Sequence, residues 1–203
     1  MLKRRLIPKL QLGLRDSYRG KQSVLVVTRK FNNRRAIGNP LSQAKIYEAQ
    51  LADELVLIDL EGSKESWAAL LETLEQVAEQ LATPLTVGGG VRDYEQVQEL
   101  LSRGADKVIL NSGAIAQPSL INQVASSYGA QCVVVSIDTR SREKNNWEVW
   151  SNSGRVQTNY DVMSWAKEAV DRGAGEIMVT SIERDGGGEG LDINLIENLT
   201  NEL

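Results

Sequence analysis

The stretch LVLIDLEGSKESWAALLETLEQVAEQLATPLTVGGG, residues 55–90, decides the fold class. It begins with a continuous apolar run, Leu55–Leu60, which is typical of a buried parallel strand. Apolar residues then recur at helical spacing over Glu65–Leu81, and a second short apolar run follows at Leu85–Val87. A strand, an amphipathic helix and another strand in this order predict a βαβ unit, which requires a parallel sheet.

The same alternation continues along the rest of the chain. A hairpin of Trp147–Trp150 and Arg155–Thr158 is expected to interrupt it, and the residues between Leu12 and Asn39 are expected to form a long loop. Helices are expected at about 41–51, 65–81, 94–102, 120–127, 162–172 and 193–201. Strands are expected at Leu6–Leu12, Leu55–Leu60, Leu85–Val87, Lys107–Leu110, Cys132–Ile137 and Glu176–Thr180.

Six βα units are compatible with an open doubly wound sheet or with a (β/α)₈ TIM barrel of which about six units are present. A short echo between Ala52–Asp59 and Ala174–Ser181, half a barrel apart, favours the barrel. We therefore expect a single incomplete barrel domain over residues 1–203 that lacks strands 7 and 8. Its first and last strands would expose unpaired edges, so we expect a fragment or a chain that needs a partner.

Composition excludes several classes of function. The net charge of −4 gives no basic field for nucleic acid, and no apolar run approaches the ~20 residues that span a membrane. The single cysteine, Cys132, rules out a disulfide framework and favours the cytoplasm. The absence of histidine excludes Ser-His-Asp catalysis and histidine metal sites, so acid–base chemistry must use carboxylates, lysine or tyrosine. No metal and no organic cofactor is expected.

Polar residues and glycines follow the predicted strands, at the end of a barrel where ligands bind. Gly88–Gly90 would let backbone N–H groups approach a phosphate, and Asn111 and Ser112 offer further donors. Asp138 ends the fifth strand and could act as a general acid or base. The alternatives are a tight turn at the glycines and a helix-capping aspartate at Asp138.

Charged residues mark the opposite ends of the strands. Arg5, Glu54, Lys107 and Glu176 lie at or just before the starts of four predicted strands, which converge on one face of a barrel. Two cations and two carboxylates there could pair into a closed ring. The alternative is a set of unrelated salt bridges that serve stability.

Seven ordered segments resemble the cyclase (synthase) subunit family of imidazole glycerol phosphate synthase, and the resemblance runs along nearly the whole chain. The family is a (β/α)₈ barrel, so the resemblance favours that fold over the open sheet. The segments are Leu6–Pro8, Ala52–Val56, Pro84–Gly90, Gly104–Val108, Ser136–Asp138, Gly173–Glu176 and Thr180–Gly186.

The resemblance implies a function. In this family a separate glutaminase subunit, bound as a heterodimer, releases ammonia that crosses the barrel from its bottom. At the top, ammonia attacks a phosphorylated substrate, which is cleaved and cyclised to imidazole glycerol phosphate and an aminoimidazole carboxamide ribotide. This chain is thus expected to be the ammonia-accepting lyase/cyclase half of a glutamine amidotransferase, with a phosphorylated small molecule as substrate.

The resemblance also implies roles for individual residues. Asp138 and Asp59 match catalytic positions, Thr180 matches a substrate-binding position, and Asp106 matches a position that contacts the glutaminase. Phosphate binding is implied for Gly89, Gly90, Asn111 and Ser112, and at a second site for Asp185 and Gly186. The ammonia gate is implied for Arg5, Glu54, Lys107 and Glu176.

One catalytic position departs from the family. The family has aspartate at the end of the first strand, where this chain has Gln11, which cannot take a proton at neutral pH. Paralogues without that aspartate are associated with amidation of sugars for surface polysaccharides, and Gln11 favours that group. Gln11 also leaves open a non-catalytic scaffold that binds the glutaminase, or an inactive fragment. It counts against the related sugar-phosphate isomerase barrel, which needs the same carboxylate.

The basic segment 15–35 lies where the family has a mobile loop that covers the substrate. Its cationic side chains could attract a phosphate-rich ligand. A solvated hairpin is the alternative, because Ser23–Phe31 contains the β-prone run VLVV.

Overall fold

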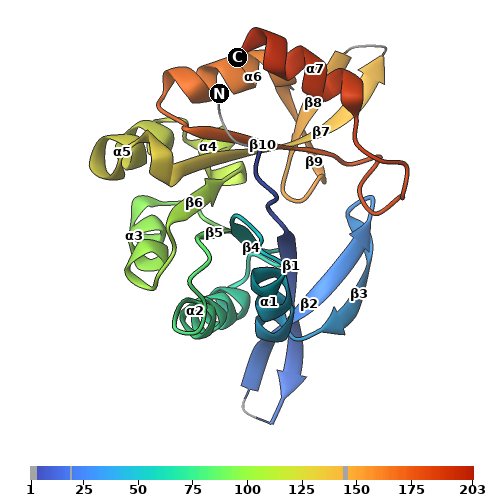
Figure 1. Cartoon of the computed structure of the whole chain (residues 1–203). Coiled ribbons are helices and arrows are strands. Elements are labelled where there is room, and N and C mark those ends of the chain that lie inside the picture. Colours follow the sequence, from blue (N-terminus) through green and yellow to red (C-terminus); the bar gives the residue numbers. More distant parts are fainter. Residues whose placement is uncertain (1–3, 19, 144–145) are drawn as a thin grey trace. The chain divides into compact units, whose positions relative to one another are not determined.

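The computed structural model describes residues 4–18, 20–143 and 146–203 (Figure 1). The chain forms two compact units, and each is described by itself. The first unit comprises Met1–Val27 and Arg35–Ile109, and the second comprises Thr28–Arg34 and Leu110–Leu203. No helix in the described ranges is long and apolar enough to cross a membrane.

The first unit is built on parallel strands that alternate with helices. Its strands follow the order β3-β2-β1-β4-β5-β6, in which β1, β4, β5 and β6 are parallel. The strands are β1 (Lys9–Ser17), β2 (Gly20–Arg29), β3 (Asn32–Gly38), β4 (Leu55–Asp59), β5 (Leu85–Gly88) and β6 (Lys107–Leu110). The helices are α1 (Pro40–Ala49), α2 (Lys64–Ala78) and α3 (Tyr94–Ser102).

The segment after the first strand is not the long loop that the sequence predicted. β1 continues to Ser17, and β2 pairs antiparallel with it from Gln11↔Val26 to Ser17↔Gly20. The run Val24–Val27 at the centre of β2 consists of strand-favouring apolar residues, and Val24, Leu25 and Val26 are buried. A turn at Lys30 and Phe31, both with positive φ, then leads into β3. The hairpin alternative is therefore confirmed.

The same pairing covers part of the edge that the first strand was expected to expose. β1 pairs with β4 over Lys9–Leu12 and with β2 over Gln11–Ser17, so Gln11 and Leu12 are the residues of the expected strand that are paired on both edges.

The second unit repeats the strand–helix pattern around one long strand, β7. Parallel β10 pairs with one edge of β7, and antiparallel β8 and β9 extend the other edge. The strands are β7 (Val133–Glu143), β8 (Asn146–Ser151), β9 (Val156–Asp161) and β10 (Glu176–Ser181). The helices are α4 (Ser112–Ala116), α5 (Ser119–Tyr128), the 3₁₀ turn η1 (Ala130–Cys132), α6 (Val162–Asp171) and α7 (Ile193–Glu202).

The six βα units and the predicted hairpin are confirmed, with two differences in the second unit. The fifth strand runs on to Glu143 because its polar second half pairs with β8. The short helix α4, directly after β6, was not expected, because its five residues are too few to show helical periodicity. The predicted α/β class with a mostly parallel sheet is confirmed and is consistent with a (β/α)₈ barrel, and the sheet is not closed among the described residues. That residues 1–203 form a single domain stays a prediction.

Side-chain alternation separates the two faces of these strands. Asp59 of β4 bonds to Ser66 of α2, so the face shared by Leu55, Leu57 and Asp59 is the one that the helix covers. The opposite face carries Val56 and Ile58. In β7, Val133, Val135, Ile137 and Thr139 are fully buried on one face, and Ser136, Asp138 and Arg140 lie on the other.

Asp161 caps α6, and its removal should destabilise the fold. Its Oδ1 accepts the backbone N–H of Ser164 at 3.0 Å, and its Oδ2 accepts the Ser164 hydroxyl. Burial raises the pKa of this carboxyl, but the hydrogen bonds from Ser164 and the nearby backbone outweigh burial and lower it. We expect Asp161→Ala to lower the free energy of unfolding by about 1 kcal/mol in urea titrations near neutral pH.

Because the folded-state pKa of Asp161 is depressed, its stabilisation is present above the unfolded-state pKa and is lost as the pH falls through the folded value. The matched control is Asp171→Ala at the last residue of the same helix. A carboxylate there opposes the helix dipole, so removing it should not lower the free energy of unfolding. Equal destabilisation by the two substitutions would contradict the assignment of the cap.

Candidate functional site

Asp138 lies on the face of β7 opposite to Val135, Ile137 and Thr139. It is 9% exposed, and its Oδ2 accepts a hydrogen bond of 2.9 Å from Asn111 Nδ2. In the strand register it lies between Thr180 of β10 and Trp150 of β8, and directly paired residues of neighbouring strands share a face. The structure thus brings together Asp138, Thr180 and Asn111, three of the residues that the sequence predicted for the site.

Ser112, the next predicted residue, lies at the start of α4. Its Oγ accepts the backbone N–H of Asn152, from the turn between β8 and β9, at 2.9 Å. The hydroxyl proton of Ser112 is left available as a donor. The Oδ1 atom of Asn111 is buried and has no hydrogen-bond partner among the described residues.

Asp185 and Gly186, predicted for a second phosphate site, contact the tip of the β2–β3 hairpin. Thr28 Oγ1 donates to Asp185 Oδ2 at 2.6 Å, and the backbone N–H of Lys30 donates to the Asp185 carbonyl at 2.8 Å. A Cβ atom on Gly186 would lie 2.0 Å from the Thr28 carbonyl oxygen. The hairpin tip therefore occupies one oxygen of this carboxylate.

The strand starts of the first unit carry a buried ion cluster. Glu54 is 3% exposed, and its Oε2 receives Arg5 Nη1 at 2.8 Å and Lys107 Nζ at 2.7 Å. Its Oε1 receives the hydroxyl of Thr86 from β5. Two cations bonded to one oxygen compensate the desolvation of the carboxylate. Three of the four predicted gate residues are thus in direct contact.

Two further residues predicted at strand starts have different surroundings. Glu176 begins β10 in the second unit, and its association with the Glu54 cluster stays a prediction. Asp106 is exposed, and its Oδ2 accepts the backbone N–H of Leu85 at 2.8 Å. That bond ties the starts of β5 and β6, so Asp106 has a structural role beside its predicted contact with a glutaminase.

Asp59, at the end of β4, is held by its own turn. Its Oδ1 accepts the backbone N–H of Glu61 at 3.0 Å, and its Oδ2 accepts the backbone N–H of Gly62 at 2.9 Å and the Ser66 hydroxyl at 2.7 Å. The register pairs Asp59 with Leu12, so its side chain lies on the face opposite to that of Gln11, which pairs with Ile58. The structure therefore gives Asp59 a positioning role, and its catalytic role stays a prediction.

Gly89 and Gly90 form the turn after β5 and press against the turn after β4. A Cβ atom on Gly89 would lie 2.1 Å from the carbonyl oxygen of Asp59, and one on Gly90 would lie 3.1 Å from the Gly62 Cα. Both glycines have positive φ, of 100° and 76°. Only glycine has no Cβ atom to collide with the Asp59 backbone and adopts a positive φ without strain, so position 89 requires glycine.

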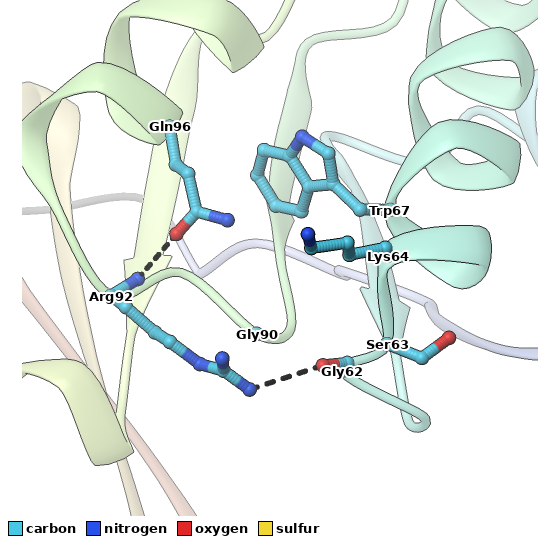
Figure 2. Close-up of a pocket in the computed structure, with 7 residues that line it drawn as sticks. All are labelled: Gly62, Ser63, Lys64, Trp67, Gly90, Arg92 and Gln96. Atoms are coloured by element: carbon cyan, nitrogen blue, oxygen red, sulfur yellow. Dashed lines mark hydrogen bonds between the residues drawn. The ribbon is translucent and has the colours of Figure 1, made fainter.

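A pocket opens beside Gly90 and carries two cations (Figure 2). Arg92 extends from the chain before α3, and its Nη2 donates to the Gly62 carbonyl at 3.1 Å, while its backbone N–H donates to Gln96 Oε1. Lys64 and the Trp67 ring approach from α2. The pocket is lined by Gly62, Ser63, Lys64, Trp67, Gly90, Arg92 and Gln96.

The cations of this pocket suit a small anion, and the sequence analysis missed them. Lys64 and Arg92 each lie a few residues beyond a strand end, about thirty residues apart in the chain, so neither gave a signal by itself. Asn111 and Ser112 belong to the second unit, and their association with Gly90 in one phosphate site stays a prediction. Among the described residues, no three histidine, cysteine or carboxylate side chains meet in a group that could hold a metal ion.

Comparisons with known proteins point to one family. Residues 12–203 of this chain match the sequence model of a protein family described as 'Histidine biosynthesis protein'. A candidate imidazole glycerol phosphate synthase subunit, hisF2, of Prochlorococcus marinus (strain MIT 9313) is 58% identical over 203 residues, which are 100% of this chain and 78% of that protein.

Imidazole glycerol phosphate synthase subunits HisF from two other bacteria are also similar. The protein of Gluconacetobacter diazotrophicus is 42% identical over 97% of this chain and 73% of its own length. The protein of Dictyoglomus thermophilum is 42% identical over 97% of this chain and 75% of its own length.

The close approach of Gly89 to the Asp59 backbone predicts that a larger side chain at position 89 destabilises the fold. We expect Gly89→Ala to lower the free energy of unfolding by roughly 3 kcal/mol or more, because the new Cβ meets backbone atoms that cannot move aside. Gly190→Ala is the control, since Gly190 has a similar φ of 78° and a Cβ atom added there would have no neighbour within 4 Å. It should lose only about 1 kcal/mol from backbone strain, and equal losses in urea unfolding would contradict the close approach.

Proposed function

Because the chain belongs to the histidine biosynthesis protein family, as a homologue of imidazole glycerol phosphate synthase subunit HisF, we propose that it is an ammonia-accepting lyase/cyclase subunit that works with a glutaminase. Its reaction takes place at Asp138, on a phosphorylated sugar-like substrate. The observation that carries this proposal is the position of Asp138: a buried carboxylate near the end of the part of β7 that pairs with parallel β10, on the face opposite to Val135 and Ile137.

The surroundings of Asp138 suit acid–base work. Its Oδ2 is oriented by the amide of Asn111, and Thr180 lies next to it across the β7–β10 pair. A carboxylate that is fixed by a neutral donor keeps its capacity to exchange a proton with a substrate. In this proposal Asn111 positions Asp138, and Thr180 and Ser112 contact the substrate.

The phosphate-binding groups in the proposal come from strand ends. Gly89 and Gly90 bring backbone close to the ligand on one side, with Arg92 and Lys64 supplying positive charge to the same pocket. Asp185 and Gly186 are proposed to take part in a second phosphate site in the second unit.

A second candidate function rests on Gln11. Ring closure in the histidine pathway is expected to use two carboxylates, and glutamine cannot exchange a proton at neutral pH. Gln11 favours transfer of ammonia to a nucleotide sugar, without imidazole formation. Supplying the glutaminase with glutamine and either the bisphosphate ribotide or a nucleotide sugar separates the two candidates by which compound is consumed. If neither is consumed although the glutaminase binds, a non-catalytic scaffold is the correct interpretation.

Asp138→Asn tests the catalytic assignment. We expect turnover to fall by about 10²–10⁴ with either glutamine or ammonium chloride as the nitrogen source, because the acid–base group is lost. The Asn111 amide can turn over to donate and accept, so the fold should be retained, as a thermal melt will verify. Asp171→Asn, on the surface of α6, is the control and should keep full turnover. Unchanged turnover in Asp138→Asn would remove Asp138 from the mechanism.

Lys107→Met tests whether the Glu54 cluster passes ammonia. Loss of one of the two cations on Glu54 Oε2 should change the entrance but not the chemistry. We expect glutamine-dependent turnover to fall roughly tenfold, while turnover with saturating ammonium chloride changes by less than about threefold.

The control for the gate is Lys167→Met, which removes an exposed lysine that pairs with Glu202 on the helical surface. It should leave both activities unchanged. If Lys107→Met lowers both activities to the same extent, the cluster serves stability alone.

A further inference from the structure

Arg140 lies on the same face of β7 as Asp138, two residues further along the strand. Its guanidinium carbon is 4.5 Å from the centroid of the Trp150 ring, and Trp150 is the residue directly opposite Asp138 in the β7–β8 pair. Stacking on an aromatic face fixes the plane of a guanidinium and leaves its N–H groups pointing outward from the edge.

The charge of Arg140 is not neutralised by a carboxylate in the described chain. The carboxylate directly opposite it in the strand register is Glu148. Glu148 Oε1 instead pairs with Arg142 Nη1 at 3.3 Å, and its Oε2 accepts from Gln157 Nε2 at 2.8 Å. The one hydrogen bond recorded for Arg140 joins its Nη2 to the Gly154 carbonyl at 3.4 Å, which is long for such a bond.

Three buried polar atoms around Asp138 lack partners among the described residues. They are the Nε of Arg140, the Nε1 of Trp150 and the Oδ1 of Asn111, which holds Asp138 through its other amide atom. Buried polar groups are almost always satisfied, and two orphan donors beside a stacked cation call for an acceptor that carries negative charge.

We propose that Arg140 and Trp150 form an oxyanion-binding subsite next to Asp138, which holds a phosphate or carboxylate group of the substrate through Arg140 Nε and Trp150 Nε1. This deepens the proposed function and rests on it, because it names the group that is held beside the catalytic carboxylate. Both side chains are partly exposed, although Arg140 Nε and Trp150 Nε1 are themselves buried, so an anion reaches these two atoms only when the side chains around them shift. Arg140 would thereby determine which substrates are accepted at Asp138.

The test follows two signals in ¹⁵N–¹H spectra of the full chain: the indole N–H of Trp150 and the Nε–H of Arg140, assigned with Trp150→Phe and Arg140→Lys. Inorganic phosphate and sodium acetate are titrated in separate arms. We expect one of the two anions to shift both signals saturably. Phosphate would identify a phosphoryl group and acetate a carboxylate.

Arg140→Gln should weaken the binding of that anion roughly tenfold or more, as judged by the Trp150 signal, because a charge-assisted hydrogen bond is lost. Arg140→Lys keeps the positive charge but loses the planar guanidinium edge, so it too should weaken binding of the anion. It replaces Arg140→Gln in the test if Arg140→Gln does not fold. Arg155→Gln is the control, since it removes an exposed arginine of the same hairpin. Its affinity for the anion should stay within about twofold of that of the unaltered chain.

The proposal is overturned if neither anion moves the two signals saturably, or if the foldable variants of Arg140 bind as tightly as the unaltered chain. These titrations need neither glutaminase nor turnover. A chain that binds the anion through Arg140 but shows no ammonia-dependent turnover would contradict the proposed function alone.

Discussion

Successive side chains of a strand leave it on opposite faces, and that constraint positions every candidate functional group in this protein. One face of each parallel strand must seal against helices, as Leu57 and Val135 do. The other face is then the place where Glu54, Asp138 and Arg140 can carry charge. A register slip of one residue would move Asp138 under the helices and carry Thr139 to the open face, so the apolar packing that fixes the register also fixes the site.

Two aspartates at the ends of parallel strands show how surroundings divide their roles. Asp59 accepts three hydrogen bonds from its own turn and from α2, so both of its oxygens are engaged in holding the chain. Asp138 receives its recorded bond from the side chain of Asn111, on a different strand end. A carboxylate saturated by local backbone donors is suited to shaping a turn, and Gly89 packs against that turn.

The sequence predicted the order of strands and helices because each continuous apolar run and each amphipathic segment leaves a local signal. It did not predict β2 and β3, since the short apolar run Val24–Val27 lies within a basic, polar segment and forms a strand through its pairing with β1. It also could not assign faces, because short strands that are buried on both sides show no alternation. Asp59 and Gln11 were therefore expected at one site although their side chains lie on opposite faces. Arg140 was missed because the polar residues after Ile137 become strand only through pairing with β8.

Local charge and overall charge have opposite signs in this protein. The chain carries a net charge of −4, yet Arg140 has no carboxylate partner in the described chain. Lys64 and Arg92 add positive charge to the pocket beside Gly90. Between charges separated by more than about 10 Å, salt screens most of the interaction, so the surface acids do not cancel these cations. An anionic substrate is thus repelled weakly by the whole molecule and attracted strongly at the strand ends, which is the distribution that selects for a bound orientation rather than for indiscriminate association.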